Sequence, residues 1–266
     1  MTKYTDPALW TKDAPVLYEV RNRIAYITLN RPEVRNAMDG PMADMLKEAW
    51  IRLEADEDAL VGVLCANGDH FSVGKDLKEK DDSGIPHRLH QAYPPNGTKL
   101  FKPLIAAVQG YCMGGAYGFA MRGSDITIAA DDMILGFPEA KAGIAIAPIG
   151  YLPLMPFKLS LEYMLLSWKG GRFIDAKKAA HFGIVNEVVP REKLMEEATR
   201  WAEMLLEIPP MYTKAIKVGH YRDMQLRYLQ NEYDYVDYIH PQQISEDRQE
   251  ALNAFFEKRT PHFKNR

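Results

Sequence analysis

Apolar and polar side chains alternate in two short runs near the start of the chain. Residues 16–20 and 24–29 are rich in β-branched and aromatic side chains, and Asn22-Arg23 form a polar step between them. Two alternating runs around a short polar turn are typical of a β-hairpin, so we predict one here. Over residues 41–54, apolar positions recur every three or four residues after Pro41, which predicts a helix.

Further along, short apolar runs alternate with a helical pattern. The helical pattern covers residues 114–121 and begins at two glycines. Alternation of strands and helices predicts an α/β domain with a largely parallel sheet. The apolar runs of strand length are residues 61–66, 104–108, 126–130 and 133–137.

Two segments between these runs have weaker patterns. Residues 67–80 have the pattern of a loop that turns into a helix. Residues 81–97 are rich in Pro, Gly, His and Asp and have no period, which predicts an irregular or mobile flap.

The last third of the chain changes character and is mainly helical. Apolar periodicity predicts helices over residues 159–168, 175–182 and 191–207, with a strand over residues 184–189. After Pro209-Pro210, the helical pattern continues to about residue 258 and carries closely spaced tyrosines. Short terminal helices cannot bury so many aromatic side chains alone, so we expect an oligomer interface to cover them.

Composition and charge exclude several classes of protein. The 266 residues have a formal charge of −3 and no basic block, so we expect no nucleic-acid partner. The longest apolar region, residues 143–157, contains three prolines and is too short to cross a membrane. The first residues are polar and have no signal-peptide pattern, and Cys65 and Cys112 lie in apolar stretches as expected of buried thiols. We therefore expect a cytoplasmic protein without disulfides.

Several familiar catalytic motifs are missing. The chain has no phosphate loop, no dinucleotide glycine motif, no His-Glu-x-x-His and no Gly-x-Ser-x-Gly. His87 and His90 have the spacing of one helix face, but we find no further ligands near them, so we expect no metal. Ser72-Val73-Gly74-Lys75 matches the Ser-x-x-Lys of β-lactamases without that family's companion motifs, so the match is interpreted as accidental.

Two glycine-marked turns are candidates for chemistry. Residues 71–78 and residues 109–116 each lead from a strand through glycine toward a helix start, where backbone N–H groups have no partner within the helix. If one N–H from each turn converged on a point, the pair would form an oxyanion hole. The alternative is that both are ordinary strand-to-helix turns.

An acidic residue follows one of the apolar strands. Glu139 comes directly after Phe137-Pro138, in a segment with few other charges. A buried glutamate with a raised pKa can donate and accept protons near neutral pH. The alternative is a structural glutamate that caps a helix or pairs with Lys141.

Together these segments resemble the enoyl-CoA hydratase/isomerase family, the crotonase superfamily. The resemblance implies a spiral of ββα units over residues 1–200, with residues 201–266 as a helical region that forms homotrimers, often paired as hexamers. It also implies an acyl-CoA thioester as substrate, with coenzyme A as part of that substrate and no further cofactor. The segments that carry it, in family order, are residues 29–38, the two glycine turns, Pro138-Glu139, residues 183–188 and residues 254–259.

The resemblance also assigns roles to particular residues. The backbone N–H groups of Lys75 and Gly115 would bind the thioester oxygen, and Glu139 would be the acid/base. Hydratases with two glutamates carry their first one where this chain has Gly118, so single-glutamate members are better precedents. Those members include enoyl-CoA isomerases and hydroxycinnamoyl-CoA hydratase-lyases. The hydratase-lyases place a tyrosine near the substrate, and Tyr233 or Tyr235 is its counterpart, with Tyr235 taken as catalytic; the alternative is that these tyrosines pack in an interface.

The resemblance further indicates where the substrate binds. Arg35, Lys78 and, from a neighbouring subunit, Lys258 are candidates for the coenzyme A phosphates, with solvated surface cations as the alternative. The Lys75 side chain is a candidate for contact with a polar acyl group, with solvent exposure as the alternative. The substrate-binding positions are Arg35, Val73, Asp76, Leu77, Lys78, Gly114, Gly118, Tyr233 and Lys258.

These residues support one functional hypothesis and leave alternatives of two kinds open. The first is a hydratase or hydratase-lyase that acts on an unsaturated acyl-CoA. A double-bond isomerase, or a thioester hydrolase or decarboxylase, is the alternative within the enzymes. A noncatalytic binding subunit is the alternative from another class.

Overall fold

The computed structural model describes residues 7–79, 92, 94, 100–143, 155–169, 172–219 and 245–263. After a single 3-10 turn, η2 (Pro7–Leu9), the chain forms β1 (Val16–Arg21) and β2 (Ile24–Leu29), which pair antiparallel with Arg21 opposite Ile24. Asn22 and Arg23 both have positive φ, 51° and 65°, as a tight two-residue hairpin turn requires. The predicted hairpin is confirmed.

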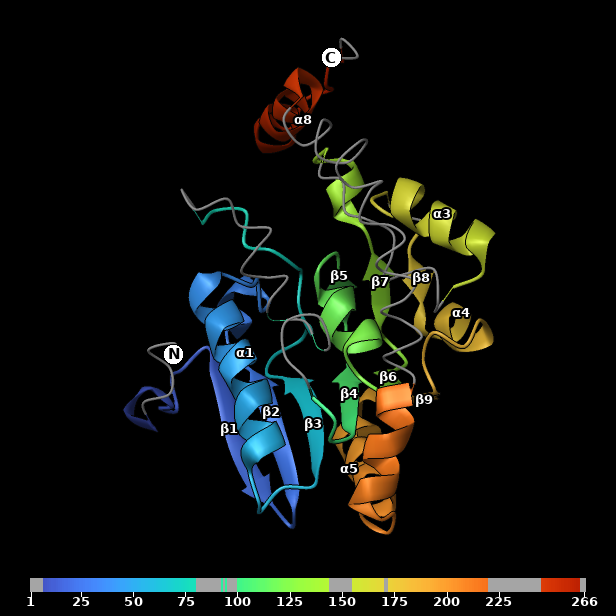
Figure 1. The fold of residues 1–266 in the computed structure, drawn as a ribbon. Helices are drawn as coiled ribbons and strands as arrows, with labels where there is room; N and C mark the ends of the chain where they lie inside the picture. Colours follow the sequence, from blue (N-terminus) through green and yellow to red (C-terminus); the bar gives the residue numbers. More distant parts are fainter. Residues whose placement is uncertain are drawn as a thin grey trace.

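A six-stranded sheet forms the body of the fold (Figure 1). Its strand order is β1-β2-β3-β4-β6-β9, and every pair after the hairpin is parallel. The prediction of an α/β fold with a largely parallel sheet is confirmed. The remaining strands of the sheet are β3 (Val61–Ala66), β4 (Leu104–Val108), β6 (Ile126–Ala130) and β9 (Glu187–Val189).

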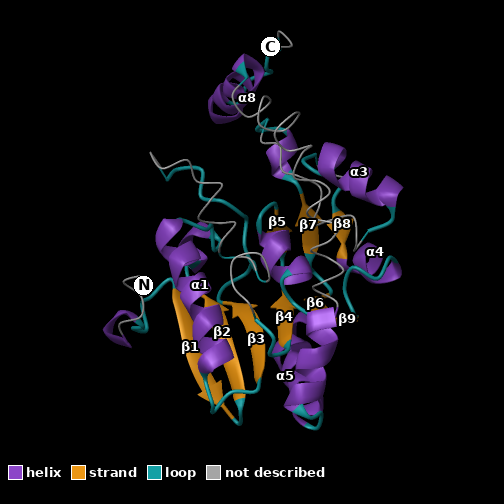
Figure 2. Cartoon of the chain, in the orientation of Figure 1, coloured by secondary structure: helices purple, strands orange, loops and turns teal. Residues whose placement is uncertain are grey.

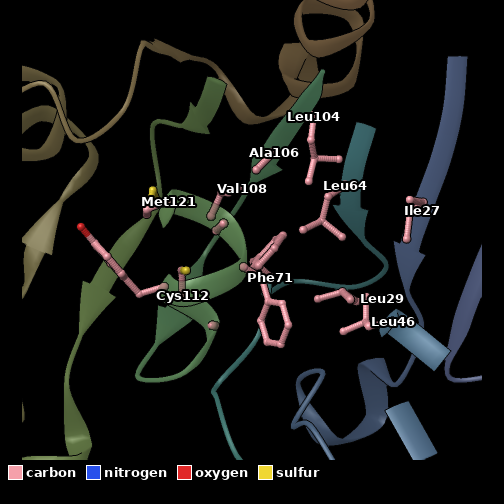
Figure 3. Close-up of a cluster of buried hydrophobic side chains, with 14 of the residues drawn as sticks. Ile27, Leu29, Leu46, Leu64, Phe71, Leu104, Ala106, Val108, Cys112 and Met121 are labelled. Atoms are coloured by element: carbon pink, nitrogen blue, oxygen red, sulfur yellow. The ribbon is translucent and has the colours of Figure 1, made fainter. Parts of the chain in front are cut away.

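Helices cover both faces of this sheet (Figure 2). α1 (Gly40–Ala55), capped by the Asp39 side chain, packs on one face, and α5 (Leu194–Leu206) packs on the other against β3, β4 and β6. Neighbouring strand residues therefore belong to different clusters, with Ala106 facing the α1 side and Ile105 and Ala107 facing α5. Figure 3 shows Phe71 within the cluster on the α1 side, together with Leu64 and Cys112.

A second, smaller sheet follows. Its order is β5-β7-β8, formed by β5 (Tyr111–Met113), β7 (Ile134–Gly136) and β8 (Ile174–Asp175). β5 and β8 are short and were not predicted, because two or three residues carry no visible period. The predicted helices beside this sheet are confirmed as α3 (Phe157–Leu166) and α4 (Ala176–His181), and the helix predicted at 191–207 is η7 (Arg191–Lys193) followed by α5.

Two predicted elements differ in extent from the structure. The strand predicted at 184–189 begins only at Glu187, because Gly183 and Ile184 donate backbone hydrogen bonds to Ala180 and Ala179 and close the end of α4. The helix predicted at 114–121 starts with a turn and continues as a π-helix, η4 (Gly118–Arg122), in which the Gly123 N–H donates to the Gly118 carbonyl.

The prediction that residues 67–80 turn into a helix is wrong for the described part, residues 67–79. This segment makes isolated bridges to other parts of the chain, Ser72 with Cys112 and Lys75 with Met38, instead of helical hydrogen bonds. Most of the predicted flap, residues 81–97, lies outside the described residues. Of those that are described, Ala92 is buried and its carbonyl accepts a hydrogen bond from Trp50 Nε1 at 2.8 Å.

The C-terminal part is described in two helical pieces. Residues 210–219 are helical, and the buried Lys217 ammonium donates to Asp125 Oδ2 and the Lys102 carbonyl, each at 2.7 Å. These bonds hold the helix of residues 210–219 against the segments that precede β4 and β6. α8 (Glu246–Glu257) places Ala251 so close to Gly143 that a Cβ there would lie 2.8 Å from the alanine methyl group. Both free cysteines, Cys65 and Cys112, are buried as predicted.

Candidate active site

Glu139 lies in a short 3-10 turn, η5 (Pro138–Ala140), that follows β7. Pro138 occupies the first position of the turn and preorganises it. The Glu139 Oε2 atom is buried and has no hydrogen-bond partner among the described residues. Lys141, the ion-pair partner considered in the alternative interpretation, instead places its ammonium over the Trp168 ring, 5.8 Å from its centre.

Burial raises the pKa of Glu139 from 4.5 to about 7. The backbone N–H groups of Glu139 itself and of Gly115 favour the carboxylate and offset part of this rise in pKa. Because this pKa is close to 7, both protonation states of Glu139 are populated near neutral pH. Such a carboxyl group can both donate and accept a proton.

We expect Glu139→Gln to stabilise the protein at high pH. A carboxyl group with a raised pKa in the folded state contributes stability below pH 4.5 that is lost as the pH rises toward 7. Glutamine does not ionise, so the unfolding free energy of the variant should exceed that of the wild type by about 3 kcal/mol more at pH 8 than at pH 4. Urea unfolding at both pH values measures this difference, and a pH-independent difference would contradict the raised pKa.

The two glycine turns meet at one place beside Glu139. The Ser72 N–H donates to the Tyr111 carbonyl and the Met113 N–H donates to the Ser72 carbonyl, both at 3.0 Å, so the first turn lies alongside β5. Gly74 has a φ of +86°, and a Cβ there would lie 2.8 Å from the Met113 carbonyl oxygen and 3.4 Å from the Gly115 nitrogen. Only glycine fits this conformation and this close approach.

Two backbone hydrogen bonds fix the orientation of the peptide between Gly74 and Lys75. Met38 donates its N–H to the Gly74 carbonyl at 2.8 Å and accepts from the Asp76 N–H at 2.9 Å. In a trans peptide the C=O and the N–H point in opposite directions. Because the Gly74 carbonyl faces Met38, the Lys75 N–H points away from Met38.

The Gly115 N–H lies at the start of a helical turn and next to Glu139. The Tyr117 N–H donates to the Gly114 carbonyl at 3.0 Å, which begins the turn, and the first backbone donors of such a turn are left for other acceptors. Gly114 has a φ of +53°, and a Cβ there would lie 1.8 Å from Glu139 Oε1. The carboxylate therefore packs directly against the backbone of the second turn.

The other predicted site residues differ in how they are placed. Val73, Asp76 and Leu77 are half-buried beside Lys75 in the first turn, whereas Lys78 is exposed. Gly118, half-buried, begins η4, so this turn carries no carboxylate at that position.

The remaining predicted residues lie at the surface or outside the described residues. Arg35 is exposed with a φ of 55°. Lys258 is exposed at the end of α8, and within the described ranges no hydrogen bond or ion pair links it to Glu139 or to the glycine turns. Tyr233 and Tyr235 lie outside the described residues.

Sequence reasoning missed the polar side chains that hold the first turn. Asn36 is fully buried; its Nδ2 donates to the Asn67 and His70 carbonyls at 2.9 Å, and its Oδ1 accepts from the Arg31 N–H at 2.7 Å. Ser72 Oγ donates to the Asn36 carbonyl at 2.7 Å. The sequence did contain one indication of this role, because Arg31 and Asn36 both lie in the family motif of residues 29–38.

His70 joins the two turns as a neutral side chain. Its Nδ1 accepts a hydrogen bond from the Tyr111 N–H at 3.2 Å, and its ring stacks on Tyr111 with the ring centres 4.4 Å apart. Burial, followed by the nearby Arg35 guanidinium, lowers the pKa of His70. His87 and His90, the candidate metal ligands, lie outside the described residues.

The described residues show neither a metal site nor a membrane-spanning helix. Among them, no three His, Cys, Asp or Glu side chains gather as a metal ion requires. No helix in the described ranges has the length and apolar character to cross a membrane.

Comparison with known proteins gives a consistent result. Residues 19–266 match the family described as Enoyl-CoA hydratase/isomerase. The (E)-benzylidenesuccinyl-CoA hydratase of Thauera aromatica is 31% identical over 262 residues, covering 94% of this chain and 99% of that protein. The carnitinyl-CoA dehydratase of Citrobacter koseri is 33% identical, covering 91% and 95%. The crystal structure of carnitinyl-CoA hydratase from Mycobacterium avium superposes with a TM-score of 0.81 at 28% identity, covering 96% of this chain and 100% of that one.

Proposed function

This chain belongs to the enoyl-CoA hydratase/isomerase family, and we propose that Glu139 is its proton donor and acceptor while the Lys75 and Gly115 N–H groups bind the thioester oxygen. The protein has the crotonase fold and is an enzyme that acts on acyl-CoA thioesters with the chemistry of a hydratase, a lyase. The observation that carries the assignment of Glu139 is its buried Oε2 without a hydrogen-bond partner, on a carboxyl group with a pKa of about 7, beside the Gly115 N–H.

One carboxyl group is sufficient for hydration in this arrangement. The Glu139 carboxylate takes a proton from water as the water oxygen bonds to C3 of the enoyl group. The C2–C3 double-bond electrons move onto the thioester oxygen, where the two N–H groups stabilise the enolate. Protonated Glu139 then returns the proton to C2, which completes the addition of water and restores the carboxylate.

Double-bond isomerisation is the second candidate, and Gly118 favours it. Two-glutamate hydratases divide the work on water between two carboxylates, and a glycine cannot activate water. An isomerase needs a single base that removes a proton at one carbon and returns it at another. Glu139 alone meets that requirement, since both of its protonation states are populated near neutral pH.

Mass-resolved product analysis in deuterated water distinguishes these reactions. The purified protein is incubated with a panel of alkyl and aryl enoyl-CoA thioesters. We expect a gain of water, or the release of an aldehyde with loss of a two-carbon acyl unit if hydration is followed by cleavage. A shifted double bond or deuterium uptake without added water supports the isomerase. No mass change and no shifted double bond with any thioester would favour a noncatalytic subunit.

Exposed apolar side chains support assembly through the C-terminal half. Phe157 and Leu165 on α3 are 65% and 62% exposed, and Met211 in the helix of residues 210–219 is 77% exposed. Large apolar side chains with this much exposure are typical of protein–protein contacts. We propose that residues 201–266, the helical region that follows the 1–200 core, help to form a homotrimer or a hexamer. Lys258 would then approach the coenzyme A of a neighbouring subunit, while Arg35 and Lys78 would contact the phosphates from within.

A further inference from the structure

We propose that Arg31 is a positioning residue for the oxyanion hole. Its guanidinium clamps the segment that carries Lys75, so that the Lys75 N–H faces the thioester oxygen. This inference rests on the proposed function of the Lys75 N–H and adds a residue that does not itself touch the substrate.

Arg31 binds both of the segments that meet beside Lys75. Its Nη1 donates to the Ala37 carbonyl at 2.6 Å and lies 2.9 Å from Asp39 Oδ2. Its Nη2 lies 3.4 Å from Asp76 Oδ2, on the residue that follows Lys75. The three charged side chains are 16–20% exposed, so solvent screens them less than it screens a surface pair.

The clamp supports a short ladder of backbone hydrogen bonds. Met38 makes two bonds to this segment, to the Gly74 carbonyl and from the Asp76 N–H, and the peptide of Lys75 lies between them. Arg31 holds Ala37 and Asp39 on either side of Met38 and holds Asp76 across the ladder. Without the guanidinium, Asp76 loses its contact with Arg31. The segment that carries the Lys75 N–H is then less firmly held at the residue next to this proposed donor.

Other contacts fix the parts of the turn farther from Lys75. Asn36 and Ser72 hold the residues before Gly74, as described above. After Asp76, the Glu79 carboxylate accepts from the Gly40 N–H at 2.9 and 3.1 Å. Among the described side chains, Arg31 is thus the one whose hydrogen bonds and ion pairs reach both Asp76 and the residues on either side of Met38. Because oxyanion stabilisation depends on donor placement to a fraction of an ångström, the clamp should act on the rate.

The Arg31 side chain is partly exposed to solvent, at 20% of its surface. A cleft of about 570 Å³ is lined by Arg31 together with neighbouring residues. A guanidinium ion from solution can therefore enter the space that an alanine at position 31 would leave. The other residues that line the cleft are Lys12, Asp13, Pro15, Asn30, Pro32, Glu33 and Asp39.

Chemical rescue of Arg31→Ala tests the proposal. We expect kcat for the best thioester of the panel to fall about 10- to 100-fold, with KM changed much less. Added guanidinium chloride, well below unfolding concentrations, should recover a large part of the lost kcat. Amide hydrogen exchange over residues 72–79 should become faster in the variant and slow again with guanidinium.

The control is Arg200→Ala, which removes an arginine that donates to Glu197 on the exposed face of α5. This variant should keep wild-type kcat, should not respond to guanidinium, and should leave exchange over residues 72–79 unchanged. If Arg31→Ala does not fold, Arg31→Lys takes its place, because a single ammonium cannot contact Asp39 and Asp76 in the same forked geometry. It should then show the same fall in kcat and the faster exchange.

The outcomes separate this inference from the proposed function. Wild-type kcat in the Arg31 variant, or a loss that guanidinium does not relieve together with unchanged exchange, overturns the positioning role. If the wild type turns over none of the thioesters, the proposed function fails, and hydrogen exchange still decides whether Arg31 clamps the segment.

Discussion

Glu139→Gln is expected to lower kcat by about 10²- to 10⁴-fold, because the substitution removes the acid/base and keeps its shape. The side chain amide can neither take a proton from water nor deliver one to carbon. The Lys75 and Gly115 N–H groups remain in place, so the thioester should still bind. We therefore expect a loss in kcat with little change in the affinity for a nonreactive acyl-CoA.

Steady-state kinetics and calorimetric titration measure these two quantities separately. Glu203→Gln, an exposed position of α5, is the matched control and should leave both unchanged. Unchanged kcat in Glu139→Gln would remove Glu139 from the chemistry and favour a different base. If Glu139→Gln loses both binding and kcat, the carboxyl group is instead needed to keep the site open for the substrate.

The catalytic and stability predictions for Glu139 are two consequences of one feature. Burial of the Glu139 carboxyl group, whose Oε2 atom has no hydrogen-bond partner, costs stability once the group ionises, and the same burial brings its pKa to about 7. The Glu139→Gln variant, which can no longer transfer protons, is therefore expected to be more stable than the wild type at high pH.

The elements that sequence could predict are those with local causes. The hairpin follows from alternation around a turn, and β3, β4 and β6 follow from apolar runs buried on both faces. Residues 67–79 have no such local cause, because Ser72 and Asp76 donate their N–H groups to residues far away in the chain. A periodic pattern does not reveal hydrogen bonds of this kind, so the helix predicted there was wrong.

The candidate site was predictable to a similar extent. Glu139 after an apolar strand and the two glycine turns are visible as types of residue in sequence order. The clamp formed by Arg31, Asp39 and Asp76 is not visible, since many acidic side chains are available and only the folded chain selects two of them. The meeting of Gly114 with Glu139 likewise depends on the pairing of β5 with β7.

Gly114→Ala is expected to be the most damaging single-methyl change in the site. The added Cβ would lie 1.8 Å from Glu139 Oε1, 2.4 Å from its carboxyl carbon and 2.5 Å from Oε2, so the carboxyl group must move. The φ of +53° also places alanine in the left-handed region, at a cost of about 1–2 kcal/mol. The Gly115 N–H follows directly in the chain, so both proposed catalytic groups are displaced together.

Gly183→Ala separates the backbone cost from the collision. Gly183 has a φ of +70°, but a Cβ there would meet nothing within 4 Å. Both variants should lose about 1–2 kcal/mol of unfolding free energy from the left-handed backbone. Only Gly114→Ala should also lose at least the 10²- to 10³-fold in kcat that removal of one oxyanion donor costs. If the two variants have equal kcat, the carboxyl group of Glu139 does not depend on its contact with Gly114, and the acid/base must be held in place by other residues.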